Sequence, residues 1–494
     1  MKLKLTACAA LAAAMFSLPM SAGNEYGLPE EIKDGNILHC FDWRIGDVTK
    51  ELPNIAEAGF VAVQISPVQA ISPTGYNWSN LYRPYDFSFS KQLGLGTEAN
   101  LRTLCSEAEK YGIYVIVDVV FNHVDNGSNH DAWWNSNGRL RSTTSMVNYG
   151  NRHSITHDRI GEYPEVNSED PDVIERAKSF IESLKELGVR GIRFDAAKHI
   201  ALPSEGCDFW KEVTSVPDMF YYGEILDGPG GNNANALMKE YTDYMYVTDD
   251  SFSSRVRSNA GIPSTTGNWN TKGIDGKKLI YWGESHDTFA NAPGYGGVTK
   301  NTSQELIDRC YAFVGSRAEG IALYFSRPSY KDYSDIKVGQ KGSTHFVDPQ
   351  IAEINKFKNA MIGKAECYTR SSSGAVGCIT RDGGGAVIVN RNGAGAVSID
   401  NGNGYCPAGT YIDKVSGNQF VVTAETITGN TGDSGIAVIY NNVDSGINDV
   451  LDMEFDSTDC TWYTLQGIRI DQPTTPGIYI GADRKGKTRK MVIR

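Results

Sequence analysis

The chain has 494 residues, with 40% hydrophobic and 21% charged side chains, which is ordinary composition for a globular protein and enough length for a large domain plus smaller ones. Its 59 acidic and 47 basic residues give a net charge of -12. This balance argues against binding to nucleic acid or to an anionic membrane surface, so we expect no nucleic-acid partner.

The first residues, MKLKLTACAALAAAMFSLPMSA, combine two lysines with a short apolar run and end on small residues at Ser21 and Ala22. This pattern is typical of a secretory signal peptide, and the run is too short for a typical membrane-spanning helix. We expect residues 1–22 to be a signal peptide and the mature protein to be an exported monomer without a membrane span, located in the periplasm, at the cell surface or outside the cell. The cysteines lack the tight pairing of a zinc site, and we assign no disulfide.

From about residue 35 to 345, short apolar runs alternate with amphipathic helical patterns. Eight runs read as strands: NILHCFDW, GFVAVQISP, YGIYVIVDVVF, GVRGIRFDA, MFYYGEIL, DYMYVTDD, KLIYWGES and GIALYFS. Strands that are apolar on both faces fit a parallel sheet covered by helices. We predict an α/β fold built on a (β/α)8 TIM barrel, which eight units favour over an open doubly wound sheet.

One helix is predicted in detail from PDVIERAKSFIESLKELG. Asp170 is placed to cap it, Pro171 suits its first turn and Gly188 ends it. A single apolar stripe then runs along the helix, formed by Val173, Ala177, Phe180, Leu184 and Leu187.

The domain boundaries follow changes in pattern. We assign residues 23–123 and 168–365 to the barrel, and residues 124–167, which are rich in Asn, Ser, His and Gly, to a subdomain inserted after the third strand. Trp133 and Trp134 in this insertion could stack on a ligand, but core residues of a small subdomain are the more ordinary interpretation. Residues 366–441, with short strands and Gly-rich turns, predict a C-terminal antiparallel β domain. Residues 442–494 are a linker and a further unit with a basic end, for which a solvated tail is the alternative.

Charged residues stand out in GIRFDAAKH, where Arg193 and Asp195 share one face of a strand. Taken alone, they fit either a structural ion pair or a functional site. Four runs, however, end in acids and histidines: DVVFNH, GIRFDAAKH, FYYGEIL and YWGESHD, on the third, fourth, fifth and seventh strands. In a barrel these ends surround one mouth, where active sites lie.

Three carboxylates around one mouth suit glycoside hydrolysis with retention, in which one acid attacks and another donates a proton. Arg193 would favour the ionised form of Asp195, which makes Asp195 the candidate nucleophile. Glu224 has more apolar neighbours in sequence and is the better candidate for general acid and base. Asp287 is the third acid.

The four runs resemble the signature regions of the alpha-amylase family of glycoside hydrolases, in the family's order. Further runs, ILHCFDW, NWSNLYRP, LGTEANL, YGIYVIVDVVFNH, ESHDTFAN and FSRP, are similar to the saccharifying alpha-amylases of bacilli, and the resemblance covers roughly residues 35 to 441. It implies retaining endo-hydrolysis of α-1,4-glucosidic bonds in starch, glycogen and related polysaccharides. It also implies that Asp195 is the nucleophile, that Glu224 is the general acid and base, and that Asp287 orients the substrate and stabilises the transition state.

The same resemblance implies roles in substrate binding. Arg193 would position the nucleophile, His123 and His286 would hydrogen-bond the sugar at the cleaved bond, and that sugar would stack on Tyr82. Lys198 would reach the leaving-group side.

A calcium ion is implied between barrel and insertion, with oxygen ligands that suit this hard cation. Asn122 would supply a side-chain oxygen, and Thr156 and His199 would supply main-chain carbonyls. The acidic ligand falls at Glu165, where many relatives carry Asp. This longer side chain changes the affinity or the geometry that the resemblance would predict.

Three further features qualify the resemblance. Ser79 and Asn80 stand where close relatives carry aromatic residues, which predicts fewer stacking surfaces in the donor subsites. Ser285 stands where chloride-dependent members carry Asn, so we infer no chloride activation. The final unit, with WYTLQGIRI and PGIYI, resembles the carboxy-terminal sorting modules of exported Bacteroidetes proteins, which implies secretion machinery as a partner.

Two other functions compete with an endo-acting amylase. The same residues serve maltose-forming exo-cleavage and transglycosylation in other family members. A starch-binding surface protein with weakened catalysis is an alternative of a different class. The intact set of three acids argues against this second alternative, which only the changed donor subsites favour.

Overall fold

The computed structural model describes residues 24–72, 76–89, 94–292 and 294–440, and, nearer the C-terminus, residues 461–464, 468–473, 477–482 and 488–493. The predicted signal peptide lies outside these described residues. The chain divides into two compact units, residues 1–440 and 441–494.

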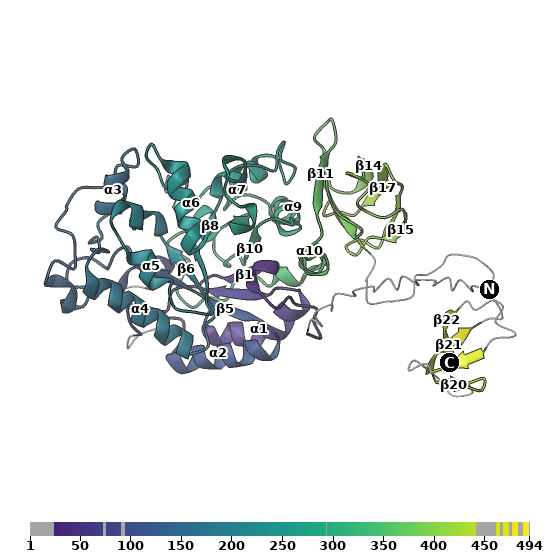
Figure 1. Cartoon of the computed structure of the whole chain (residues 1–494), viewed down its shortest axis with the longest axis horizontal. Helices are drawn as coiled ribbons and strands as arrows, with labels where there is room; N and C mark the ends of the chain where they lie inside the picture. The colour runs from purple at the N-terminus through teal and green to yellow at the C-terminus, as the bar shows by residue number, and fades with distance from the viewer. Residues whose placement is uncertain are drawn as a thin grey trace, which may run out of the picture. The chain divides into compact units, whose positions relative to one another are not determined.

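A closed barrel of eight parallel strands forms the centre of the first unit (Figure 1). Around the barrel the order is β1-β10-β9-β8-β7-β6-β5-β2, so the first strand closes against the last. Each of the eight predicted runs contains one of these strands, which confirms the predicted TIM barrel. The strands are β1 (Ile37–Cys40), β2 (Ala62–Ile65), β5 (Tyr114–Val120), β6 (Gly191–Asp195), β7 (Phe220–Gly223), β8 (Tyr246–Thr248), β9 (Leu279–Trp282) and β10 (Ile321–Phe325).

A helix follows each barrel strand and covers its outer face. These helices are α1 (Ile45–Glu57), α2 (Glu98–Lys110), α4 (Pro171–Glu186), α5 (Phe209–Val213), α6 (Ala234–Tyr244), α7 (Asp250–Ser258), α9 (Gln304–Gly315) and α10 (Pro349–Ala360). At α4 the side chain of Asp170 accepts hydrogen bonds from the backbone of Asp172 and Val173, and Gly188 follows the helix with a φ of +101°. The predicted apolar stripe of α4 is buried.

Shorter elements lie between the strands and helices of the barrel. The antiparallel pair β3 (Ala70–Ile71) and β4 (Pro84–Asp86) flanks the 3-10 turn η2 (Trp78–Tyr82). The insertion after β5 contains η3 (Ala132–Asn135) and the short helix α3 (Arg152–His157). Two elements begin just beyond barrel strands, η4 (Ala197–His199) after β6 and α8 (His286–Ala290) after β9. The remaining 3-10 turns are η1 (Ile32–Asp34), η5 (Pro203–Glu205), η6 (Asn270–Lys272), η7 (Gly276–Lys278) and η8 (His345–Val347).

The two tryptophans of the insertion serve its core. Trp134 is fully buried and packs against Phe87, with ring centres 4.6 Å apart. The ring of Trp133 is contacted by the guanidinium groups of Arg139 and Arg176, at 3.8 and 4.4 Å from its centre. These contacts support the structural interpretation over a ligand-stacking role.

Two antiparallel sheets follow α10. One has the order β11-β12-β13-β18 and packs against α9 and α10, and the other has the order β14-β17-β16-β15 (Figure 1). A separate apolar core fills the space between the sheets. The predicted C-terminal antiparallel β domain is thereby confirmed. Its strands are β11 (Glu366–Arg370), β12 (Val376–Arg381), β13 (Gly385–Asn390), β14 (Gly395–Asp400), β15 (Gly409–Ile412), β16 (Gln419–Val422), β17 (Thr426–Thr431) and β18 (Ile436–Tyr440).

The second unit contains one antiparallel sheet of order β20-β19-β21-β22. Its strands are β19 (Thr461–Tyr463), β20 (Arg469–Ile470), β21 (Gly477–Ala482) and β22 (Thr488–Ile493). In the part of the chain that the structure describes, none of the helices has the length and apolar character needed to cross a bilayer.

Candidate active site

The carboxyl end of the barrel carries an arginine that binds several acids. In the register of β5 and β6, Asp118 lies opposite Arg193. Nη1 of Arg193 donates to both carboxylate oxygens of Asp118, at 2.9 and 3.0 Å. The hydroxyl of Tyr82 donates to the same carboxylate at 2.9 Å. Asp118, which is fully buried, therefore connects Tyr82 to the arginine.

The same guanidinium also contacts two of the predicted catalytic acids. Its Nη1 lies 2.7 Å from Oδ1 of Asp195, and its Nη2 lies 3.2 Å from Oε2 of Glu224. Oε2 of Glu224 also accepts the backbone N–H of Ala196 at 2.9 Å. Ala196 adopts a left-handed conformation, with a φ of +49°, which is strained for a residue other than glycine and is found most often at functional sites. One arginine thus holds Asp195 and Glu224 beside each other.

Asp287 joins this cluster from the first turn of α8, which Ser285 caps. Asn291 donates a hydrogen bond to Oδ1 of Asp287 at 3.0 Å, and Nε2 of His286 lies 3.4 Å from Oδ2. Burial raises the pKa of Asp287, whereas Arg193, Asn291 and a side-chain hydrogen bond with Glu224 lower it. The structure therefore brings all three predicted acids together.

Three carboxyl groups, those of Asp118, Asp195 and Glu224, contact one guanidinium. Burial raises the pKa of Asp118 to about 6 and the pKa of Asp195 well above its ordinary value, although the bound Arg193 lowers both. The positive charge of Arg193 therefore opposes the effect of burial on Asp118 and Asp195 without cancelling it.

The predicted sugar-binding residues line the same mouth. The rings of Tyr82 and His286 are stacked, with centres 5.3 Å apart and an angle of 11°. Nε2 of His123 lies 2.9 Å from the carbonyl oxygen of Tyr82. Burial lowers the pKa of His286 to about 3 and that of His123 to about 4, so both rings are neutral at neutral pH.

Lys198 lies on the side of the mouth that carries Glu224. Its Nζ donates to the carbonyl of Leu226, two residues beyond Glu224, at 2.5 Å. The same ammonium lies 4.9 Å from the centre of the Tyr149 ring. Lys198 thus lies beside the predicted general acid, and its contact with the leaving-group side stays a prediction.

Of the four predicted calcium ligands, Asn122 and Glu165 contact each other, and His199 contacts the residue before Thr156. Nδ2 of Asn122 donates to Oε2 of Glu165 at 3.1 Å, and Nδ1 of His199 lies 2.8 Å from the carbonyl oxygen of Ile155, the residue before Thr156. The buried Oδ1 of Asn122 has no hydrogen-bond partner among the described residues. An unpartnered buried carbonyl oxygen beside a buried carboxylate fits the oxygen donors that calcium prefers.

The composition of this donor set separates it from a transition-metal site. Within the described residues, no group of three or more His, Cys, Asp or Glu side chains is placed to hold a metal. The predicted calcium ligands would be one carboxylate, one amide oxygen and main-chain carbonyls, so this prediction does not depend on such a group.

Sequence reasoning did not single out three residues of this region. Asp118 carries the charge that fixes Arg193, Tyr163 stacks on His123 at 5.0 Å, and the buried His39 packs edge-on against His286 at 5.4 Å. Asp118 alone had a usable signal, because it begins the run DVVFNH inside an otherwise apolar strand. Tyr163 and His39 reach the site only through the fold.

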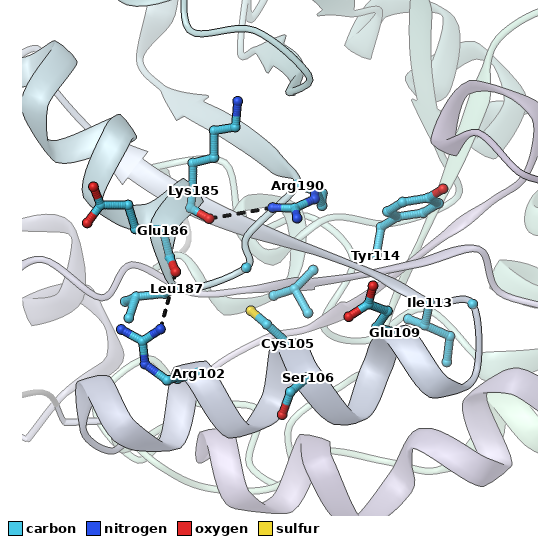
Figure 2. A pocket seen from close by; sticks show the side chains of 13 residues that line it. Arg102, Cys105, Ser106, Glu109, Ile113, Tyr114, Lys185, Glu186, Leu187 and Arg190 are labelled. Carbon is cyan, nitrogen blue, oxygen red and sulfur yellow. Dashed lines mark hydrogen bonds between the residues drawn. The ribbon is translucent and has the colours of Figure 1, made fainter.

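The cavity in Figure 2, of about 440 Å³, lies at the other end of the barrel. It is bounded by residues of α2, the end of α4 and the amino ends of β5 and β6. Arg102 donates to the carbonyl of Glu186, and Arg190 donates to that of Lys185. A second hollow of about 600 Å³ shares Tyr114 and Arg190 with it. This end of a TIM barrel contributes to stability, whereas catalytic residues lie at the opposite end.

Comparison with known sequences finds similar proteins for this part of the chain. Residues 28–252 match the family described as "Alpha amylase, catalytic domain". The chain is 31% identical to an alpha-amylase of Clostridium acetobutylicum over 370 residues, which are 69% of this chain and 45% of that protein. It is 26% identical to an alpha-amylase of Butyrivibrio fibrisolvens over 415 residues, 72% of this chain and 41% of that protein. The chain thus spans less than half the length of these two relatives.

Solved structures share the fold. The alpha-amylase I of Eisenia fetida superposes with a TM-score of 0.67 at 18% identity, over 84% of this chain and 97% of that one. A gamma-CGTase of an alkalophilic Bacillus clarkii gives a TM-score of 0.66 at 16% identity, over 93% of this chain and 82% of that one. At these identities the likeness establishes the barrel architecture alone.

Proposed function

We propose, on the premise that residues 28–252 form a catalytic domain of the alpha-amylase family of glycoside hydrolases, that this chain hydrolyses internal α-1,4-glucosidic bonds of starch, glycogen and related α-glucans with retention. The observation that carries the proposal is the contact of one guanidinium, that of Arg193, with Asp118, Asp195 and Glu224. A retaining mechanism needs its two carboxyl groups roughly 5 to 5.5 Å apart, and acids bound to one arginine are held close together.

In the first step, a carboxylate oxygen of Asp195 attacks the anomeric carbon and the bond to the glycosidic oxygen breaks. Glu224 donates its proton to that oxygen as the leaving chain departs. In the second step, Glu224 takes a proton from water, the water oxygen attacks the anomeric carbon, and the bond to Asp195 breaks. The double displacement restores the original configuration and both acids.

Neighbouring groups keep these acids in place. The hydrogen bond from the backbone of Ala196 and the contact with Arg193 both fix Oε2 of Glu224. Tyr82 offers its ring to the reacting sugar, and the neutral His286 and His123 can hydrogen-bond its hydroxyl groups. Asp287, anchored by Asn291, places a carboxylate where it can stabilise the positive charge that develops on the sugar.

We also propose a calcium ion held by Asn122, Glu165 and the carbonyls of Thr156 and His199. The unpartnered Oδ1 of Asn122 supports this assignment. When bound, the ion would supply positive charge that ties the insertion to the barrel. Its effect on catalysis would be indirect, through the position of His123, the residue after Asn122.

The cellular location and partners are part of the proposal. The N-terminal sequence supports export, and the second unit, with its four-stranded sheet, supports an interaction with secretion machinery of the kind that its sequence resembles. We propose a monomer with an α-glucan as its substrate. All the site residues lie in the first unit, so the activity does not require the second.

The test is a time course of products from the purified mature protein on soluble starch, with Asp195→Asn and Glu224→Gln as matched variants. We expect an early collapse of iodine staining with mixed short oligosaccharides, and loss of both in each variant with an unchanged melting temperature. Maltose as the sole early product would indicate exo-cleavage, and longer products would indicate transfer. Starch binding without products would identify a binding protein, and native-like activity of Asp195→Asn would overturn the assignment of the nucleophile.

A further inference from the structure

Two loops that are distant in sequence meet on one side of the active-site mouth. The segment 76–82 contains η2, and the segment 330–338 follows β10. Nδ2 of Asn77 donates to the carbonyl of Tyr333 at 2.5 Å, and the backbone of Trp78 donates to the carbonyl of Ile336 at 3.2 Å. These bonds fix Tyr333 against η2.

A series of aromatic contacts links Tyr333 to the reaction centre. The rings of Tyr333 and Trp78 meet edge to face at 5.7 Å, and those of Trp78 and Tyr82 do so at 5.8 Å. Tyr82 in turn stacks on His286 at 5.3 Å. Trp78 is buried, whereas Tyr82 and Tyr333 are half-buried and keep part of their surface accessible.

The small residue at position 79 makes this arrangement possible. The hydroxyl of Tyr333 donates to Oγ of Ser79 at 2.7 Å, and Nη2 of Arg83 lies 3.5 Å from the same oxygen. The sequence predicts fewer stacking surfaces here because Ser79 and Asn80 are not aromatic. Tyr333 supplies an aromatic ring at this place from a different loop.

The order of strands decides which part of a substrate would pass Tyr333. Around the barrel, β10 and β2 flank β1, and β1 lies opposite β7. Glu224 follows β7, and Lys198 lies beside it. The leaving chain, which Glu224 protonates, therefore exits over the β7 side. The sugars that remain attached to Asp195 extend over the β1 side, where η2 and the loop after β10 meet.

We propose that Tyr333 is a substrate-binding residue that stacks on a glucose unit on the donor side of the cleaved bond, and so sets the preference of the enzyme for long α-1,4-glucan donors. This inference rests on the proposed function. The face of a tyrosine ring suits the apolar face of glucose, and its hydroxyl is oriented by Ser79. Tyr333 touches neither Asp195 nor Glu224 in any contact described above, so its role is in specificity and not in the chemical step.

The experiment compares wild type with Tyr333→Ala, Tyr333→Phe and a control, Tyr330→Ala. Tyr330 is a tyrosine of the same loop that is 51% exposed. The substrates are 4-nitrophenyl α-glycosides whose glucan chains lengthen from maltose to maltopentaose, and kcat/KM is measured for each. Loss of a stacking contact is expected to lower kcat/KM of Tyr333→Ala on the long chains by about 2- to 12-fold. The value for the maltoside, and all values for Tyr330→Ala, should be unchanged.

Tyr333→Phe keeps the ring and is expected to retain most of the preference for long chains. Equal losses of Tyr333→Ala at every chain length would show that Tyr333 merely supports Tyr82 through Trp78, and would overturn the proposal. A length dependence equal to that of wild type, or a loss in Tyr333→Phe as large as in Tyr333→Ala, would also overturn it.

Binding of maltohexaose to Asp195→Asn, with and without Tyr333→Ala, separates this inference from the function on which it rests. If wild type hydrolyses no glycoside but Tyr333→Ala still weakens binding by a similar factor, the proposed function fails and the role of Tyr333 stands. If hydrolysis proceeds but binding and length preference are unaffected, the inference fails alone.

Discussion

Asp118 makes two contacts that depend on its negative charge, one with Arg193 and one with Tyr82. It touches none of the three predicted catalytic acids directly in these contacts, and its effect on the reaction runs through the arginine. Asp118 is therefore a positioning residue. Its two hydrogen bonds with Nη1 of Arg193 fix the guanidinium that contacts Asp195 and Glu224.

We predict that Asp118→Asn lowers kcat on soluble starch by about 10- to 150-fold, the factor that corresponds to one charge-assisted hydrogen bond. The amide keeps the shape of the carboxylate, so KM should change little. The matched control is Asp86→Asn, which disrupts a different buried ion pair, with Arg176. That variant should lose stability while its folded fraction keeps the wild-type kcat. Unchanged turnover in Asp118→Asn would contradict the positioning role.

Asp42, just after β1, is a buried acid of a different kind. Its side chain is fully buried, and neither carboxylate oxygen has a hydrogen-bond partner among the described residues. Burial raises its pKa from 3.8 to about 8. The folded protein therefore binds a proton that the unfolded chain has lost between about pH 4 and about pH 8, so stability falls as the pH rises through this range.

Asp42→Asn should remove this loss, since an amide does not ionise. We expect the free energy of unfolding of Asp42→Asn, relative to wild type, to increase from pH 5 to pH 8, as measured by urea denaturation at each pH. Asp332→Asn, a change at an exposed acid, serves as the control. A constant difference between Asp42→Asn and wild type across the range would show that Asp42 is ionised in the folded protein.

Among the elements, the short helix α3 is joined to the turn η4 by Arg152, which donates to the carbonyl of Lys198 at 2.6 Å. Among the contacts between the barrel and the insertion that carries α3 are the pairs Asn122 with Glu165 and His199 with Ile155. A cation bound by the folded protein alone stabilises it by mass action, about 2.7 kcal/mol when the free ion is at 100 times its Kd.

We expect a strong chelator to lower the melting temperature of wild type by a few degrees, and added Ca²⁺ but not Mg²⁺ to restore it. The melting temperature of Glu165→Gln should be the same with and without chelator. Its amide replaces the charged ligand, so this variant should not bind the ion. Elemental analysis of the purified protein provides the second measurement. The metal site would be refuted if the protein contained no calcium and its melting temperature were the same with and without chelator.

The elements also show what local sequence can predict. The eight barrel strands and α4 were predictable because each is specified by its own apolar pattern, with Asp170 and Gly188 marking the ends of α4. The three acids were predictable because they follow strands whose carboxyl ends share one mouth. Contacts between residues that are distant in sequence were not predictable. Tyr82 contacts Asp118, and Tyr333 contacts Ser79, only after the loops have packed. The residues of the calcium site came from a family resemblance and stay a prediction.

At the scale of the whole molecule, buried polar contacts join the β domain to the barrel. Arg381 of the β domain is buried and donates to the carbonyls of Ser316 and Met361, at 3.0 and 2.6 Å. Arg317 forms an ion pair with Glu366 at 2.7 Å. These bonds make the β domain part of the same compact unit as the barrel, whereas residues 441–494 form a unit of their own.

Two truncations test this division. Removal of residues 441–494 should leave kcat/KM on soluble starch and the melting temperature of the barrel unchanged. Removal of residues 366–494 should lower the melting temperature sharply, because it leaves the buried Arg317 without its partner. The division would be wrong if the shorter deletion destabilised the protein as much as the longer one.

The closure of the barrel between β1 and β10 has a consequence for the order of events during synthesis. The first strand to be synthesised, β1, can pair with its neighbour β10 only after residues 321–325 have left the ribosome. Until then the nascent chain exposes two unpaired strand edges, which are prone to intermolecular pairing. A fragment that stops at residue 252, where the family match ends, contains β1 to β8. It lacks β9 and β10, the two strands that close the barrel between β8 and β1. Such a fragment is expected to aggregate even though it holds Asp195 and Glu224.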